Sequence, residues 1–312
     1  MASSFISPND ARLVHAIAPG WDAVEIHYVR KGKGVPVVLL HGWPGFWYDW
    51  RAVIPKLSTI ADVIAPDFRG FGHSGQPAGA PAHTYAPDNY ANDIIALMDH
   101  LALDRALLVG HDIEAVVAQT LVQRTPDRFP RLVLLNPPYP GIGARRFEPE
   151  VTPEFWYYNF HNLPWASELV AYDRNTLRIY LGHFYDHWVG RKTSVKSDEF
   201  AAIVDSFAQP GVFAGSIGFY RARAAQRRAS VSKYKPEQIR QPTRILWGAL
   251  DPVIKVEWAD RLGEYFSPMT LGVLPDAGHF LPFEAPTEVL AAIEVELATM
   301  TTKASIADSR RC

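Results

Sequence analysis

Short apolar runs alternate with segments of helical periodicity along the first part of the chain. Residues 24–29 alternate between apolar and polar positions, which is typical of a strand exposed on one face. Residues 35–40 form a continuous apolar run, and three further short runs are of the type buried on both faces: 61–65, 106–109 and 132–135. Between them, residues 88–101 place apolar side chains at helical spacing, and Asp88 follows Pro87 where it could cap that helix. Strands that alternate with helices predict a doubly wound, mostly parallel α/β sheet.

This alternation stops after Pro137 and resumes at about Gln241. The stretch between them is rich in aromatic residues and helical in character, and it has no clear buried strand. The pattern then predicts two strands and two helices in the order strand 243–247, helix 256–266, strand 270–274 and helix 286–298. We therefore expect a core formed by residues 1–137 and 241–312, split by an inserted helical cap of residues 138–240. The polar tail, residues 301–312, is expected to fray.

Composition narrows the classes of function. The chain has 312 residues, 48% hydrophobic and 21% charged, with a formal net charge of −2, so no overall field recruits nucleic acid or an anionic membrane. One basic run is expected to be a solvated helix face: Arg221, Arg223, Arg227 and Arg228. The single cysteine, Cys312, excludes an internal disulfide and a cysteine-rich zinc site. Neither a signal peptide nor an apolar run of about 18 residues is visible, so we expect a soluble, cytoplasmic protein without a membrane partner.

The first motif with chemical content surrounds Asp112. Val109-Gly110-His111-Asp112-Ile113 follows a predicted strand and begins a helix, which is the setting of a nucleophile elbow with aspartate in the position of the nucleophile. An aspartate before a helix is also an ordinary N-cap, so this motif alone leaves both interpretations open.

Two later residues favour the catalytic interpretation. Asp251 lies in the loop after strand 243–247, and His279 lies in the loop after strand 270–274. The order Asp, Asp, His along the chain matches nucleophile, acid and base in hydrolases of this architecture. We therefore predict that Asp112 is the nucleophile and that His279, oriented by Asp251, is the general base.

Glycine-rich segments complete this framework. Leu40-His41-Gly42-Trp43-Pro44-Gly45 follows the second predicted strand, and the backbone N–H groups of Trp43 and Ile113 are expected to form an oxyanion hole. The turn-rich loop of residues 67–75 is expected to be structural, because its glycines permit tight backbone geometry. No Gly-Lys-Ser/Thr follows any glycine run, so a phosphate loop is excluded, and the predicted chemistry needs neither a cofactor nor a metal.

Together these residues resemble the α/β-hydrolase superfamily over almost the whole chain. Within it, the set is most similar to bacterial epoxide hydrolases, since an aspartate nucleophile is typical of the branch that holds epoxide hydrolases and dehalogenases. The segment Phe155-Trp156-Tyr157-Tyr158-Asn159-Phe160-His161 resembles the cap segment in which a tyrosine after a tryptophan polarises the epoxide oxygen. By position that tyrosine is Tyr157, with Tyr158 as the alternative one residue later. Gly218-Phe219-Tyr220-Arg221-Ala222 is similar to the site of the second such tyrosine, which implies Tyr220.

This resemblance implies conversion of a small-molecule epoxide and water to a vicinal diol. The expected intermediate is an alkyl–enzyme ester on Asp112, hydrolysed by water that His279 and Asp251 activate. The pocket is expected to be lined by aromatic residues: Trp43, Phe155, Trp156 and Phe219. Whether the protein is a monomer or a homodimer stays open.

Two alternatives rest on the residues after the nucleophile. A haloalkane or haloacid dehalogenase shares the ester chemistry, but such enzymes typically place Trp or Arg where this chain has Ile113. A non-catalytic hydrolase-fold binding protein is the other alternative, because Glu114 occupies a place where the family usually has a small residue. We expect Glu114 to be structural, with its carboxylate hydrogen-bonded to polar groups or water and outside the substrate cavity.

Overall fold

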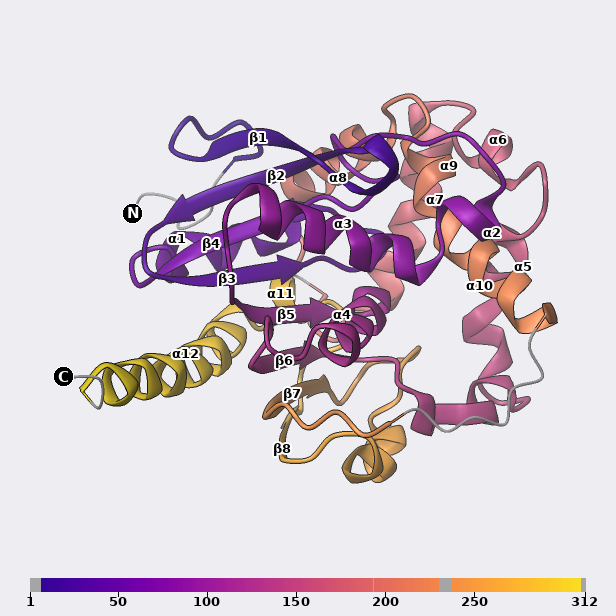
Figure 1. Cartoon of the computed structure of the whole chain (residues 1–312). Coiled ribbons are helices and arrows are strands. Elements are labelled where there is room, and N and C mark those ends of the chain that lie inside the picture. The colour runs from indigo at the N-terminus through magenta and orange to yellow at the C-terminus, as the bar shows by residue number, and fades with distance from the viewer. Residues whose placement is uncertain (1–6, 193, 230–236, 310–312) are drawn as a thin grey trace.

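The computed structural model describes residues 7–192, 194–229 and 237–309 and contains a twisted eight-stranded sheet (Figure 1). The strand order is β1-β2-β4-β3-β5-β6-β7-β8. β2 runs antiparallel to both of its neighbours, and the six strands from β3 to β8 are parallel. The strands are β1 (Val14–Pro19), β2 (Glu25–Gly32), β3 (Val35–Leu40), β4 (Ala61–Pro66), β5 (Leu107–His111), β6 (Arg131–Leu135), β7 (Thr243–Gly248) and β8 (Met269–Leu274). The predicted doubly wound, mostly parallel α/β sheet is confirmed.

The runs predicted to be buried form the centre of this sheet. Every residue of β4 and of β5 is buried, because helices cover both faces. The edge strand β1 has no counterpart among the predicted strands. Four of its six residues are exposed, so it carries little of the hydrophobic signal on which such predictions depend.

Two layers of helices cover the sheet. α3 (Pro87–His100) and α4 (Ile113–Arg124) pack on one face, whereas α1 (Ile54–Leu57) and α12 (Pro286–Ser309) pack on the other. The remaining core helices are short: α2 (Pro81–Thr84), α11 (Leu281–Glu284), and the 3₁₀ turns η1 (Trp21–Ala23), η2 (Trp47–Ala52) and η5 (Val256–Glu264).

Three details differ from the predictions. Helix α3 begins at Pro87 with Ala86 as its N-cap, so Asp88 lies in the first turn and does not cap the helix. Proline is favoured at the first helical position, and the helix therefore begins before Asp88. The predicted helix 256–266 is the 3₁₀ segment η5. α12 continues to Ser309, so the prediction that residues 301–309 fray is wrong, and residues 310–312 lie outside the described part.

The described part of the chain between β6 and β7 contains helices and no strand. We call residues 136–242 the helical insertion. It includes η3 (Pro140–Phe147), η4 (Thr152–Phe155), α5 (Trp156–His161), α6 (Ala166–Val170), α7 (Arg174–His187), α8 (Ser197–Phe207), α9 (Val212–Ser216) and α10 (Gly218–Ala229). In Figure 1 these helices gather at one end of the sheet, beside the carboxyl ends of the parallel strands.

The basic run lies in α10. Arg221 is half-buried and donates hydrogen bonds to the carbonyl oxygens of His161 and Leu163, so it ties α10 to the end of α5 instead of facing only solvent. The side chains of Arg227 and Arg228 lie outside the described part of the chain.

No single helix in the described residues has the length and apolar character of a membrane span. Among the described residues, the helices Ser197–Phe207 and Val212–Ala225 are long and apolar enough for a span only when they are taken together, and the chain bends by 90° between them.

Candidate active site

Asp112 stands at a strained turn between β5 and α4. Its backbone angles are φ 50° and ψ −132°, which a non-glycine residue adopts only under constraint. A Cβ atom on Gly42 would lie 2.6 Å from Nδ1 of His111, so glycine is required where this loop approaches the turn. Although Asp112 precedes the helix, its side chain makes no capping hydrogen bond with α4. The carboxylate is therefore free for another role.

The predicted acid and base lie beside this carboxylate. Nδ1 of His279 is 2.8 Å from Oδ2 of Asp251, and Nε2 of His279 is 3.7 Å from Oδ1 of Asp112. The other oxygen of Asp251 accepts the backbone N–H groups of Val253 and Ile254 at 2.8 and 2.9 Å. All three side chains are buried. The loops that follow β5, β7 and β8 thus bring together three residues that are far apart in sequence.

The two predicted oxyanion donors also point at Asp112. The N–H of Trp43 donates to Oδ2 of Asp112 at 3.3 Å, and the N–H of Ile113, the next residue, makes a smaller contribution to lowering the pKa of the carboxyl than the neighbouring His279 does. Two N–H groups directed at one carboxyl group suit the negative charge that forms when its ester is attacked.

The charges of these groups depend on one another. Burial alone would raise the pKa of Asp112, but the neighbouring His279 outweighs it and lowers that pKa. Burial alone would lower the pKa of His279, whereas the carboxylates of Asp251 and Asp112 raise it to about 10. These shifts favour an ionised Asp112 carboxylate next to a protonated His279 ring at neutral pH.

The helical insertion places two buried tyrosines over this site. Tyr157 of α5 and Tyr220 of α10 have ring centroids 5.7 Å apart at 83°. The Trp43 ring stacks on Tyr157 at 5.6 Å and meets Tyr220 edge-on at 5.5 Å. Burial raises the pKa of both phenols well above the usual value, and the Asp112 charge raises it further. Both groups therefore stay protonated and can donate hydrogen bonds.

Tyr158, the alternative to Tyr157, is placed differently. It is only partly buried, and it lines a surface pocket of about 280 Å³ together with Ile113 and Phe219. Its ring lies 4.9 Å from that of Tyr220 but does not stack on Trp43. This position suits a residue at the entrance to the site better than one that faces the Asp112 carboxylate.

The other predicted pocket residues surround the tyrosines to different degrees. Trp43 is fully buried, and Phe155 lies nearly parallel to Tyr157 at 6.3 Å. Trp156 is 39% exposed and packs its ring against Phe184. It therefore lies toward the outer side of the insertion.

Sequence reasoning missed His161 and Trp188. The His161 ring lies 4.7 Å from Tyr220 and 4.9 Å from Trp43, and its Nε2 is 2.7 Å from the Tyr180 hydroxyl. Burial holds its pKa well below the usual value, so the ring is neutral. Trp188 packs 4.9 Å from the His279 ring, and its carbonyl accepts the N–H of His279. Both residues stand in aromatic segments, but which ring faces the site depends on how the helices pack.

Glu114 lies in the first turn of α4, two residues after Asp112. Its side chain is buried, and Oε2 has no hydrogen-bond partner among the described residues. Burial raises its pKa well above the usual value, and the charge of Asp112 adds to this. Burial therefore favours the protonated form of Glu114 beside Asp112, and the predicted hydrogen bonds are missing at Oε2 among the described residues.

Comparison with known proteins gives consistent results. Residues 35–286 match the model of the α/β-hydrolase fold family. The soluble epoxide hydrolase of Corynebacterium sp. (strain C12) is 31% identical over 85% of this chain and 91% of its own length. Epoxide hydrolase 4 of Homo sapiens is 30% identical over 84% of this chain and 73% of its own length. The ligand-free structure of epoxide hydrolase CorEH superposes with a TM-score of 0.80 at 27% identity, covering 92% of this chain and 99% of that structure.

Proposed function

This chain belongs to the α/β-hydrolase fold family, and we propose that it is an epoxide hydrolase, which converts an epoxide and water into a vicinal diol. The observation that carries this proposal is the buried carboxylate of Asp112 beneath two neutral phenols, Tyr157 and Tyr220. An epoxide needs a nucleophile at carbon and an acid at oxygen, and this arrangement supplies both.

In the first half-reaction, Asp112 attacks a ring carbon and the bond from that carbon to the epoxide oxygen breaks. The lowered pKa of Asp112 keeps it ionised, so it needs no base. The epoxide oxygen takes a proton from Tyr157 or Tyr220, which become its hydrogen-bond donors. The products are an alkyl ester on Asp112 and a phenolate.

In the second half-reaction, water attacks the carbonyl carbon of this ester. Forming the ester removes the Asp112 charge, which is one of the two that raise the pKa of His279. The pKa of His279 therefore falls, its proton passes to the phenolate left by the first half-reaction, and the neutral ring can then act as a base. Asp251 orients it through Nδ1, so Nε2 faces the ester.

The tetrahedral oxyanion accepts hydrogen bonds from the N–H groups of Trp43 and Ile113. In other enzymes a single such donor stabilises the transition state by about 3 kcal/mol. As the intermediate collapses, the diol oxygen takes the proton that His279 removed from water. The acid proton left on Asp112 then returns to His279, which restores the resting charges, and one water is consumed for each diol formed.

The helical insertion takes the role of a cap in this scheme. Residues 138–240 would supply the acid groups and close the cavity, and residues 1–137 and 241–312 would supply the nucleophile and the base. The aromatic surroundings of the tyrosines suit an apolar, aryl-bearing epoxide. Trp43, Phe155 and Phe219 are the residues best placed to contact its ring.

The dehalogenase alternative shares Asp112, His279 and Asp251 but needs groups that hold a halide ion. Ile113 offers no side-chain donor, and two phenols match a developing alkoxide better than a halide. A panel of styrene-type and aliphatic epoxides, assayed for diol by chromatography, distinguishes the two functions when haloalkanes and haloacids are assayed for halide in parallel. We expect diol and no halide, and no product with Asp112→Ala. Halide release without diol would overturn the proposal.

A further inference from the structure

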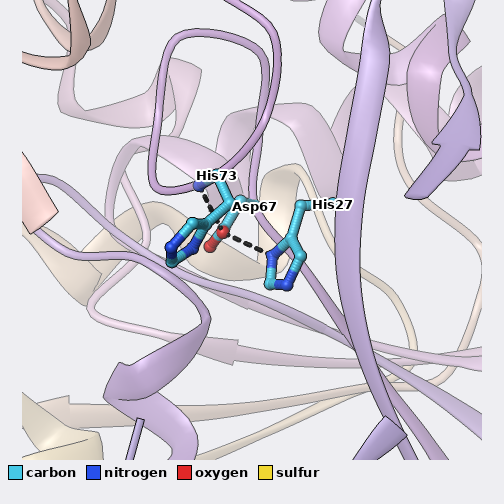
Figure 2. A group of neighbouring side chains, drawn as sticks. All are labelled: His27, Asp67 and His73. Atoms are coloured by element: carbon cyan, nitrogen blue, oxygen red, sulfur yellow. Dashed lines mark hydrogen bonds and ion pairs between the residues drawn. The ribbon is translucent and has the colours of Figure 1, made fainter. Parts of the chain in front are cut away.

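A second cluster of polar side chains lies at the antiparallel edge of the sheet, outside the catalytic site. His27 of β2, Asp67 after β4 and His73 of the following loop face one another, as Figure 2 shows. One ligand atom from each lies within 4.8 Å of the others. A third histidine, His15 of β1, stacks on His27 with ring centroids 5.3 Å apart. None of these residues takes part in the reaction proposed above.

The buried aspartate determines which nitrogen of His27 is available. Oδ2 of Asp67 lies 2.7 Å from Nδ1 of His27. The same carboxylate accepts backbone N–H groups from Trp47 at 2.8 Å and from His73 at 3.1 Å, so it acts as an acceptor throughout. Nδ1 of His27 therefore carries the proton, and Nε2 presents a lone pair. Many metal-binding histidines are held in one tautomer by a carboxylate in this way.

That lone pair faces another imidazole at a distance suited to a shared ion. Nε2 of His27 lies 3.1 Å from Nδ1 of His15. Two nitrogen ligands at ~2.0–2.1 Å in a tetrahedral zinc site lie roughly 3.3 Å apart, so the pair needs almost no movement. His73 is exposed, and its ring centroid is 5.1 Å from that of His27, so a rotamer change can bring it in as a third ligand.

An ion can reach these rings from solvent. His15, His27 and His73 all line one open surface pocket of about 660 Å³, together with residues of the preceding segment such as Asp10.

We propose that His15, His27 and His73 form a binding site for a divalent transition-metal ion of the zinc class, with Asp67 holding His27 in the required tautomer. Imidazole ligands suit zinc, copper and nickel, and solvent would occupy the fourth position. The sequence predicts no metal, because the three positions lie on separate elements without a recognisable ligand spacing.

Such an ion would link three segments of the core. It would connect the edge strand β1 to β2 and to the loop whose Asp67 accepts the Trp47 N–H. The ion would bind only the folded arrangement of ligands. It would therefore stabilise the folded chain once the free ion concentration is above the Kd of the site. The competing interpretation is a plain hydrogen bond from His15 to His27, which requires no metal.

The test uses the full chain, freed of metal by a chelator and dialysed, and titrated with ZnCl₂ in a calorimeter. We expect one ion per chain and a Tm that rises by several degrees with saturating Zn²⁺. His15→Gln and His73→Gln replace exposed side chains, so each is expected to fold and to lower the affinity by at least about tenfold. In the wild type, Co²⁺ should give the intense visible absorption of a tetrahedral site, and each variant should lose it.

A matched control lies on α7. His183 and His187 stack with centroids 5.4 Å apart and offer a second pair of imidazoles. His183→Gln with His187→Gln should leave the zinc affinity within about twofold. Unchanged affinity in either His15→Gln or His73→Gln, or loss of binding in the α7 variant, overturns the proposed site. None of these measurements depends on hydrolysis of an epoxide.

Discussion

The two halves of the candidate active site are held in place by different forces. In the core, Asp112, Asp251 and His279 stand at strand ends; short hydrogen bonds hold Asp251 and His279, and a strained turn holds Asp112. In the helical insertion, Tyr157 and Tyr220 come from separate helices, and ring packing around Trp43 positions them. Hydrogen bonds are directional, whereas ring packing tolerates small shifts. The core therefore suits the step that needs an oriented base, and the insertion can adapt to the shape of a substrate.

The largest expected effect concerns the two tyrosines of the helical insertion. Tyr157→Phe and Tyr220→Phe together should slow alkylation of Asp112 by at least about 10³-fold, because no acid would remain for the epoxide oxygen. Each single variant should lose less, since the other phenol still donates. Single-turnover kinetics measures this step. Tyr158→Phe, the control, should stay within about threefold. A larger loss in Tyr158→Phe than in Tyr157→Phe would exchange their assignments.

A buried ion pair joins the two regions. Arg51 of η2 and Glu199 of α8 lie 2.8 Å apart, and both side chains are almost fully buried. Breaking such a pair leaves an uncompensated charge, so Glu199→Gln should lower the free energy of unfolding by about 3 kcal/mol in urea titrations. The exposed pair of Arg174 and Asp205 provides the control, and Asp205→Asn should cost less than about 1 kcal/mol. Equal losses in the two variants would mean that the buried pair does not anchor the insertion.

The same contrast explains what could be predicted from the sequence. The central strands were predictable because a strand covered on both faces is mostly apolar, as β3 is. The order of Asp112, Asp251 and His279 was readable because strand ends bring them to one edge of the sheet. The edge strand β1 was missed because only Ala18 of its residues is buried, which leaves no hydrophobic pattern to recognise.

The insertion was predictable only in outline. Its helical character follows from composition, but the contact of His161 with Tyr220 depends on how α5 packs on α10. No periodicity of a single segment contains that information. The burial of Glu114 is a similar case. Its position after the nucleophile was visible in the sequence, but the lack of a partner for Oε2 depends on neighbours from other elements.

The smallest expected effect concerns Glu114. This residue belongs to the core, but its Oε2 has no hydrogen-bond partner among the described residues. Burial raises its pKa in the folded chain, so above its unfolded pKa of ~4.3 the folded state binds more protons than the unfolded state. Stability is therefore lost as pH rises from that value. Glu114→Gln removes this loss, so its Tm should exceed that of the wild type by a few degrees at pH 8 and by less at pH 5. Turnover should stay within about threefold. A hundredfold loss of turnover in the folded variant would give Glu114 a chemical role.

The proposed roles of the core and of the helical insertion are tested most directly by stopping the reaction after the first half-reaction. In His279→Gln the tyrosines and Asp112 remain, so the ring should open once, but no base remains to activate water. One equivalent of an accepted epoxide should leave one adduct per chain, found by mass spectrometry on the tryptic peptide of residues 106–124, which contains Asp112. Diol should not appear beyond trace amounts. An unmodified peptide after prolonged incubation, with the variant folded and the wild type active on the same epoxide, would contradict the ester on Asp112 and with it this account.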